Sequence, residues 1–351
     1  MKTCVNFSNV SNSELIKSLL KDIVDGKDIS LEDSKICAQG IIDGVVSPEV
    51  ISALLVALRM KGESPQEIAG FAYKMIEKSL KPKISFEVFD TCGTGGDQAH
   101  TFNASTATAI ILSSMGIPVA KHGNRAVSSS VGSADILEKI GVNINVKPED
   151  VPKELEEKKF VFLFAPLYHP AMKNVAPIRR EIGIRTIFNL LGPITNPARP
   201  QSQIIGVMSE TIAEKISEAI TILGSPKNAL IVVGSLNENK KIDEVSICGE
   251  TLFIEIKDSK VKSKYKVSPE EFGIEKSTAE SIKYNGEPSR EFLDVLSGKG
   301  RKELINFVCA NAGAALFFKG KAKNLKEGFE KSKDFILSGK VIEHLRSLTK
   351  K

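Results

Sequence analysis

The stretch Asp90-Thr91-Cys92-Gly93-Thr94-Gly95-Gly96-Asp97 decides the fold of this chain. Alternating apolar residues at 84–89 predict a strand before it, and the apolar run 107–115 behind Asn103-Ala104-Ser105-Thr106 predicts a capped helix. Three glycines within four residues let the backbone approach a ligand, and N–H groups at a helix start attract anions. The pattern favours a phosphate-binding loop over a structural turn, although it is neither a Walker loop nor the dinucleotide fingerprint.

The composition is that of an ordinary globular protein. Of 351 residues, 42% are hydrophobic and 26% charged, and this length predicts two domains. The net charge of +5 is modest and Trp is absent, which argues against binding to nucleic acid. Five widely spaced cysteines without a CxxC pair indicate a reducing compartment. With no signal-like N-terminus and no run of ~20 apolar residues, we expect a cytoplasmic protein that does not enter a membrane.

The chain has two parts with different patterns. Residues 12 to about 80 contain four short amphipathic runs, several with Ser or Pro at the start, which predict a helical module (1–80). Strands and helices alternate from residue 84 onward, as is typical of an α/β domain (84–351) with a mostly parallel sheet. We expect strands near 84–90, 117–121, 160–165, 202–208, 228–234 and 251–257, with the Lys-rich segment 257–266 as a solvated edge.

A second loop runs from Lys121 to Asp135. It follows a short apolar strand and contains two cations, a His, an Asn and four serines. A solvated surface loop would be polar too, but loops that follow strands are where open α/β sheets bind ligands. Two such loops suit a ligand with two or three phosphates, held by Lys121, Arg125 and hydroxyl or backbone donors.

An acidic pair, Asp243-Glu244, follows the polar segment 237–241. Adjacent carboxylates are commonly solvated surface charge. A diphosphate ligand, however, usually brings Mg²⁺, which needs one or two carboxylates besides phosphate oxygens and waters. The pair is therefore a candidate Mg²⁺ holder, and Ser105 at the helix start would add a neutral oxygen.

The segment from Ala165 to Pro193 is rich in Pro, Arg and Asn and interrupts the alternation of strands and helices. Such insertions often carry function, and an Arg can face a substrate carboxylate with two hydrogen bonds. Spacing alone does not decide whether Arg179 or Arg180 points inward. His122 is the one His inside a candidate site loop. We expect His100 and His344 at the surface and His169 in a structural position.

Together these motifs resemble the anthranilate phosphoribosyltransferase family, and the resemblance covers nearly the whole chain. It implies that anthranilate displaces diphosphate from 5-phosphoribosyl 1-diphosphate in tryptophan synthesis. It also implies a small helical domain, with part of 170–193 packed on it, and a larger nucleoside-phosphorylase-like α/β domain. A homodimer formed through the helical domain is a further implication.

The resemblance also assigns roles to matching positions. The diphosphate and ribose would contact Gly93, Gly96, Asp97, Thr101, Asn103, Ala104, Ser105 and Thr106. The phosphates would contact Lys121, His122, Gly123, Asn124, Arg125, Ala126, Val127, Ser128, Ser129 and Ser133. Anthranilate would contact Gly93, Asn124 and Arg179, the last near its carboxylate. Two Mg²⁺ ions would bind Ser105, Asp243 and Glu244. Lys121 and Arg125 would stabilise the leaving diphosphate, with His122 as proton acceptor.

Three positions depart from the family pattern. Gln98 stands where Gly is frequent, Ala104 where a larger apolar residue is common, and Val131 where Ser is frequent. Two other functions compete: a pyrimidine-nucleoside phosphorylase, and a nucleic-acid-binding paralogue without activity. A phosphorylase grips one phosphate and needs no metal, so the acidic pair favours the diphosphate substrate. The modest charge and the presence of Arg179 argue against the paralogue.

Overall fold

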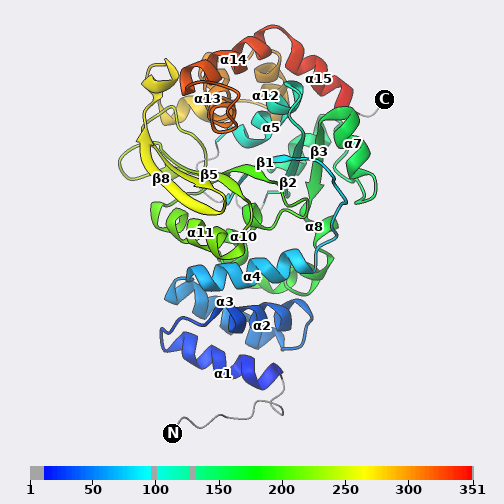
Figure 1. Cartoon of the computed structure of the whole chain (residues 1–351), viewed down its shortest axis with the longest axis vertical. Helices are drawn as coiled ribbons and strands as arrows, with labels where there is room; N and C mark the ends of the chain where they lie inside the picture. The colour runs from blue at the N-terminus through cyan, green and yellow to red at the C-terminus, as the bar shows by residue number, and fades with distance from the viewer. Residues whose placement is uncertain (1–11, 96–100, 127–130, 350–351) are drawn as a thin grey trace. The chain divides into compact units, whose positions relative to one another are not determined.

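The computed structural model describes residues 12–95, 101–126 and 131–349 (Figure 1). The chain divides into two compact units. A helical unit contains the described residues up to Ser79 together with His169–Leu191, and an α/β unit contains Leu80–Tyr168 and the residues from Gly192 onward. In the described part of the chain, we find no helix with the length and apolar character needed to cross a bilayer.

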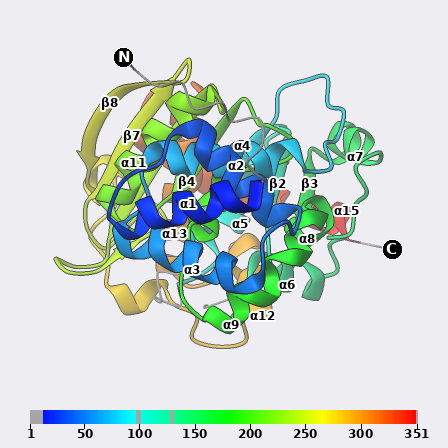
Figure 2. The same cartoon turned by 90° about the horizontal axis from the view of Figure 1, so that it is seen from below.

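Four N-terminal helices form most of the helical unit (Figure 2). They are α1 (Asn12–Val24), α2 (Leu31–Ile42), α3 (Pro48–Lys61) and α4 (Pro65–Glu77). Proline in the first turn of α3 and α4 suits a position whose N–H has no helical partner. Helix α2 packs on α4 and α1 on α3, and Leu54, Leu55 and Leu58 are fully buried. The apolar periodicity of this region therefore reports a helical core.

The segment 169–191 returns to this unit as η2 (Pro170–Asn174), α9 (Ala176–Ile182) and α10 (Phe188–Leu191). These elements pack on α2, α3 and α4, respectively. The Asn174 amide donates to the Ile42 carbonyl over 2.8 Å, and the rings of Phe71 and Phe188 meet edge to face with centroids 5.8 Å apart. The Pro-rich insertion is thus spatially part of the helical bundle.

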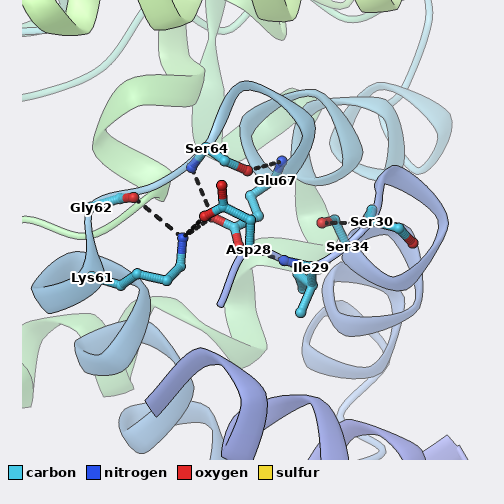
Figure 3. Close-up of polar contacts among 8 residues, drawn as sticks. All are labelled: Asp28, Ile29, Ser30, Ser34, Lys61, Gly62, Ser64 and Glu67. Atoms are coloured by element: carbon cyan, nitrogen blue, oxygen red, sulfur yellow. Dashed lines mark hydrogen bonds and ion pairs between the residues drawn. The ribbon is translucent and has the colours of Figure 1, made fainter. Parts of the chain in front are cut away.

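A buried polar cluster ties the loops of the helical unit to the start of α4 (Figure 3). Ser64 and Glu67 form a capping box, in which each side chain bonds the backbone N–H of the other. The Glu67 carboxylate, fully buried, also accepts from the Ile29 N–H at 3.1 Å and the Lys61 ammonium at 3.0 Å. Lys61 in addition contacts Asp28 and the Gly62 carbonyl. Every group in this cluster is bonded within the unit.

One sheet forms the centre of the α/β unit, with strand order β3-β2-β1-β4-β5-β7-β8 and β6 paired to β5. The strands are β1 (Phe89–Gly93), β2 (Val119–Gly123), β3 (Phe160–Phe164), β4 (Ser202–Gly206), β5 (Asn228–Ser235), β6 (Lys241–Ile242), β7 (Thr251–Lys257) and β8 (Lys260–Val267). The first five strands of this order run parallel, whereas β7 and β8 are antiparallel. The predicted mostly parallel α/β sheet is confirmed.

The order of strands reverses beside β1. The chain goes outward from β1 to β2 and β3, then returns to place β4 on the other side of β1. Gly93 and Gly206, the last residues of β1 and β4, lie opposite each other in register. In open α/β sheets the crevice at such a reversal, outside the carboxyl ends of the strands, is where ligands bind.

Helices cover the sheet. They include α5 (Ala104–Ser114), α6 (Ser133–Lys139), α7 (Val151–Lys158), α8 (Ala165–Tyr168), α11 (Glu210–Leu223), α12 (Pro288–Leu296), α13 (Lys302–Phe318), α14 (Leu325–Leu337) and α15 (Lys340–Leu348), with 3-10 turns η3 (Gly192–Ile194), η4 (Pro269–Phe272) and η5 (Ala279–Ile282). Helix α5 packs on β1, β2 and all four of α12–α15 (Figure 1). Nine of its eleven residues are buried, so α5 lies in the core of this unit.

Two expectations about local structure were wrong, and a third was incomplete. The first strand begins at Phe89 rather than at 84: Ile84 and Phe86 are half-buried, but their backbone does not pair in the sheet. His344 is not simply at the surface, since its ring nitrogen Nε2 lies 2.9 Å from the Ser113 hydroxyl in a partly buried contact. The Lys-rich segment is a solvated edge, but it is also a strand, β8, whose exposed lysines discourage further pairing.

Candidate active site

The first loop leaves the sheet at the point where β1 and β4 end. A Cβ atom on Gly93 would lie 2.2 Å from the Asp243 Oδ2 atom, and one on Gly206 would lie 1.7 Å from the Asp243 carbonyl oxygen. Both positions therefore require glycine, because any side chain would collide with residue 243. Gly96 and Asp97, the next predicted ligand contacts, lie outside the described residues.

The acidic pair accepts hydrogen bonds from this loop and from the helix that follows it. The Asp243 Oδ2 atom accepts from the Gly95 N–H over 2.7 Å, and the Glu244 Oε1 atom accepts from the Ser105 N–H over 2.9 Å. Ser105 is in the first turn of α5, so Glu244 occupies a donor at the helix start. Asp243 and Glu244 line a small cavity together with Gly93, Ser105 and Gly206. The structure thus brings together Ser105 and the acidic pair, which the sequence singled out although they are about 140 residues apart.

Asn311, which the sequence did not predict as a site residue, holds the backbone next to this pair. Asn311 lies on α13 and is buried, with its amide oxygen accepting from the Val245 N–H at 2.8 Å. Its amide nitrogen donates to the Val245 carbonyl at 3.0 Å and to the Phe307 carbonyl at 2.9 Å. The only available signal was an Asn within the apolar run Leu304–Phe318, and nothing in the sequence named its partner.

The two cations of the second loop have different environments. Lys121, on β2, is 2% exposed, and its ammonium contacts the Thr91 carbonyl and, at 3.4 Å, the Ser105 hydroxyl. It therefore reaches the start of α5 from beneath the first loop. Arg125 is exposed, and its guanidinium pairs with Asp135 at 3.0 Å and Glu138 at 2.8 Å, which raises its pKa.

The second loop is closed by Asp135. Its carboxylate accepts from the Ala126 N–H at 3.0 Å and the Gly132 N–H at 2.9 Å. The Asn124 carbonyl accepts from the Ser133 hydroxyl at 3.2 Å. Gly123 packs against Ser133 so closely that a Cβ atom would lie 2.5 Å from its hydroxyl oxygen. Both ends of the loop are therefore fixed; Val127, Ser128 and Ser129 lie outside the described residues.

His122 follows Lys121 on β2 and is buried. Its ring nitrogen Nδ1 lies 3.0 Å from the Gly192 carbonyl oxygen. Because a carbonyl only accepts hydrogen bonds, Nδ1 carries the proton and Nε2 a lone pair. Burial lowers the pKa of His122 to about 4, despite the opposing bond to Gly192, so the ring is neutral at pH 7.

Asp90, at the start of the quoted stretch, is a fully buried carboxylate that fixes β2 behind the site. It accepts hydrogen bonds from the Asn196 amide at 2.8 Å, from the N–H of the next residue, Thr91, at 2.7 Å and from the His122 N–H at 3.3 Å. Burial raises the pKa of Asp90 to about 6, while Lys121 and these donors act in the opposite direction. All three partners are donors, which suits the ionised form. Asn196 was not singled out in the sequence.

The remaining predicted contacts lie on or near α5. Thr101 pairs with Lys283 in an isolated antiparallel bridge, and Asn103 is the N-cap residue of the helix. Ala104 and Thr106 are buried in its first turn. The Thr106 hydroxyl has no hydrogen-bond partner among the described residues.

Arg179 lies in the helical unit, on α9. Its guanidinium donates to the Asn189 side-chain oxygen at 3.2 Å and stacks over the Phe188 ring at 5.6 Å from the ring centre. Burial lowers the pKa of Arg179, whereas the neighbouring Arg180 is exposed. Of the two arginines, Arg179 is the one that the structure holds in a defined position.

Two family profiles match this chain. The profile described as "Glycosyl transferase family, helical bundle domain" matches residues 17–79, and "Glycosyl transferase family, a/b domain" matches residues 85–342. Fold and site thus define a glycosyl transferase built from a helical bundle and an α/β domain.

Named relatives narrow this class. Anthranilate phosphoribosyltransferase of Geobacillus kaustophilus (strain HTA426) is 42% identical over 339 residues, which are 96% of this chain and 98% of the relative. The Thermus thermophilus enzyme superposes with a TM-score of 0.85 at 37% identity, covering 94% of this chain and 97% of that one. The Saccharomyces cerevisiae enzyme in complex with PRPP and Mg superposes with a TM-score of 0.79 at 28% identity, covering 97% of this chain and 92% of that one. The chain belongs to the anthranilate phosphoribosyltransferase family, as its motifs predicted.

Proposed function

We propose that this protein transfers the 5-phosphoribosyl group of 5-phosphoribosyl 1-diphosphate to the amine of anthranilate. The amine lone pair forms a bond to ribose C1, the bond from C1 to the diphosphate oxygen breaks, and its electron pair leaves with the diphosphate. One amine proton is released, giving N-(5-phosphoribosyl)anthranilate with inversion at C1. The observation that carries this proposal is the acidic pair lying across the glycine loop and the first turn of α5.

The residues present fit Mg²⁺. Among the described residues, no three His, Cys, Asp or Glu side chains form a group that would hold a metal by themselves. Asp243 and Glu244 instead offer two carboxylates beside the Ser105 hydroxyl, the partial oxygen set that suits an ion arriving with a diphosphate. Mg²⁺ bound there would neutralise charge on the diphosphate, and we propose that two ions bind.

Ligand binding would exchange hydrogen-bond partners at this cluster. The Gly95 and Ser105 N–H groups, which bond Asp243 and Glu244 in the structure, are suited to phosphate oxygens. We assign the carboxylates to the metal and these donors to the diphosphate. The diphosphate and ribose contacts are then Gly93, Gly96, Asp97, Thr101, Asn103, Ala104, Ser105 and Thr106.

The second loop would supply positive charge to the leaving group. Lys121 is buried beneath the start of α5, where a fixed ammonium acts in a site with little water. Arg125 is a weaker contributor, because Asp135 and Glu138 already share its charge. The other proposed phosphate contacts are His122, Gly123, Asn124, Ala126, Val127, Ser128, Ser129 and Ser133.

Anthranilate needs little activation, because its amine is neutral at pH 7 and already nucleophilic. We assign its contacts to Gly93, Asn124 and Arg179, with the Arg179 guanidinium on the carboxylate. His122 is the proposed proton acceptor: it is neutral, and its Nδ1 proton leaves the lone pair on Nε2. Positioning of the two substrates accounts for much of the remaining rate enhancement.

The reaction is tested by mixing the purified protein with Mg²⁺, 5-phosphoribosyl 1-diphosphate and anthranilate, and following the loss of anthranilate fluorescence. We expect a decay that requires all three components. Absence of decay, together with phosphate-dependent cleavage of thymidine or uridine, would overturn the proposal in favour of a pyrimidine-nucleoside phosphorylase. No observation in the described part of the chain favours that activity or nucleic-acid binding. The homodimer and the cytoplasmic location stay predictions; sedimentation of the purified protein tests the first.

A further inference from the structure

Both polar atoms of the Asn103 side chain make hydrogen bonds within the protein. Its amide oxygen accepts from the Tyr284 hydroxyl over 2.9 Å, and its amide nitrogen donates to the Val131 carbonyl over 3.3 Å. The Asn103 backbone N–H in turn donates to the Tyr284 oxygen over 3.3 Å. From the sequence, Asn103 was predicted to contact the ligand, and Tyr284 was not predicted to take part.

The protons in this arrangement are determined by chemistry. The Val131 carbonyl only accepts, so the NH₂ end of the amide faces it and the oxygen end faces Tyr284. The phenol oxygen receives the Asn103 N–H and must direct its own proton to the amide oxygen. Burial raises the pKa of Tyr284, which keeps this proton in place. Tyr284 thus determines which way the Asn103 amide points.

This amide joins the two loops of the proposed diphosphate site. Asn103 is the N-cap of α5, one residue before Ala104 and two before Ser105. Val131 ends the second loop just before Gly132 and α6. The Asn103 amide therefore fixes the separation between the start of α5 and the far end of the second loop.

Tyr284 is itself firmly held. Its ring packs on Phe102 with centroids 5.0 Å apart, and the Phe102 N–H donates to the neighbouring Ile282 carbonyl at 2.9 Å. Arg301 donates to the carbonyls of Ser281, at 3.0 Å, and Lys283. The hydroxyl is thus presented to Asn103 at the end of a segment, residues 281–283, that is held by hydrogen bonds to Phe102 and Arg301.

We propose that Tyr284 is a positioning residue for the diphosphate substrate, acting through Asn103 to hold the start of α5 and Val131 at the separation that the ligand needs. This inference rests on the proposed function. It reassigns the Asn103 side chain, proposed above as a diphosphate or ribose contact, to joining the start of α5 to Val131, and leaves its neighbours in the first turn of α5 to contact the diphosphate.

The test is Tyr284→Phe, which removes the hydroxyl and keeps the ring on Phe102. We expect the Kd for 5-phosphoribosyl 1-diphosphate with Mg²⁺, measured by calorimetry without anthranilate, to rise about tenfold. The KM for anthranilate should change by less than about twofold, a split that general destabilisation would not produce. Tyr265→Phe is the matched control: it removes a hydroxyl that bonds Glu255 at 2.6 Å on the β7–β8 ribbon, and should leave both constants unchanged.

A double-mutant cycle asks whether Tyr284 acts through Asn103. Asn103→Ala should raise the same Kd, and adding Tyr284→Phe to it should have little further effect. This second variant also keeps the test informative if Tyr284→Phe folds poorly. An unchanged Kd in Tyr284→Phe, or additive effects in the cycle, would overturn the inference. A wild-type protein that binds the diphosphate but does not modify anthranilate would overturn the proposed reaction alone.

Discussion

The buried polar cluster of the helical unit and the half-buried acidic pair beside the ends of β1 and β4 make different kinds of hydrogen bond. Glu67 bonds two backbone N–H groups and the Lys61 ammonium, in a cluster whose partners are permanent parts of the bundle (Figure 3). Asp243 and Glu244 instead accept from backbone N–H groups that suit a phosphate ligand. The first network stabilises the fold, whereas the proposed function requires a ligand to exchange the partners of the second.

The largest expected effect concerns the exchangeable network. Combining Asp243→Asn with Glu244→Gln should lower Mg²⁺-dependent turnover at least about a thousandfold, because the proposed metal loses both carboxylates. Circular dichroism and thermal unfolding should stay close to wild type, since amide oxygens can still accept from Gly95 and Ser105. Full turnover in the double variant would show that the metal assignment is wrong.

The permanent network should respond in stability. Glu67→Ala should lower the free energy of unfolding in urea by about 3 kcal/mol, because Lys61 and two backbone N–H groups lose a buried acceptor. The control is Glu77→Ala, at the exposed end of α4, where the i,i+3 ion pair with Lys74 contributes at most about 0.5 kcal/mol. Equal losses in the two variants would mean that burial of Glu67 does not matter.

His122 is a proposed site residue, and we expect it to make the stability of the protein depend on pH. Its pKa is lowered to about 4 from the ordinary 6.5, so the unfolded chain takes up this proton more readily than the folded protein. The contribution of neutral His122 to the free energy of unfolding is therefore fully present above pH 6.5 and is lost as the pH falls through 4. Between pH 7 and 4, the wild type should lose about 2 to 3 kcal/mol more unfolding free energy than His122→Gln. Parallel pH curves for the two proteins would contradict this expectation.

Arg125 should have the smallest effect. Its guanidinium is exposed and shared by Asp135 and Glu138, so Arg125→Met should raise the KM for 5-phosphoribosyl 1-diphosphate only about threefold. The control Arg180→Met removes an exposed cation on α9 and should leave this KM unchanged. A hundredfold rise for Arg125→Met would show instead that the guanidinium grips the diphosphate directly.

The sequence predicted the fold class because its signals are local. Glycine-rich turns after apolar runs, Ser and Pro at helix starts, and alternating strands and helices each depend on a few neighbouring residues. The strand assigned to 84–90 failed for the same reason. Its alternation records half-burial of Ile84 and Phe86, whereas a strand also needs a partner, and the ladder begins only at Phe89 opposite Val119 and Ser202.

For the candidate site, the sequence predicted residues by their chemical type but not the residues that hold them in place. The acidic pair was singled out because a diphosphate ligand usually brings Mg²⁺, and Lys121 because it lies in a polar loop that follows a strand. Asn311 and Tyr284 were missed because their partners lie 66 and 181 residues away, and an amide or a phenol in the sequence does not reveal its partner. The carboxylates that share the Arg125 charge could likewise be found only once α6 had folded beside the loop.

The hydrogen bonds from Gly95 and Ser105 to the acidic pair also bear on selectivity among anions. A bare phosphate that took these donors would displace two carboxylates and leave them facing a ligand of the same charge, which is unfavourable. A diphosphate that carries its own divalent cation gives the carboxylates a new partner in the same step. If the proposed function holds, the acidic pair would compete against inorganic phosphate, and an anion's affinity for this crevice would depend on the cation it brings.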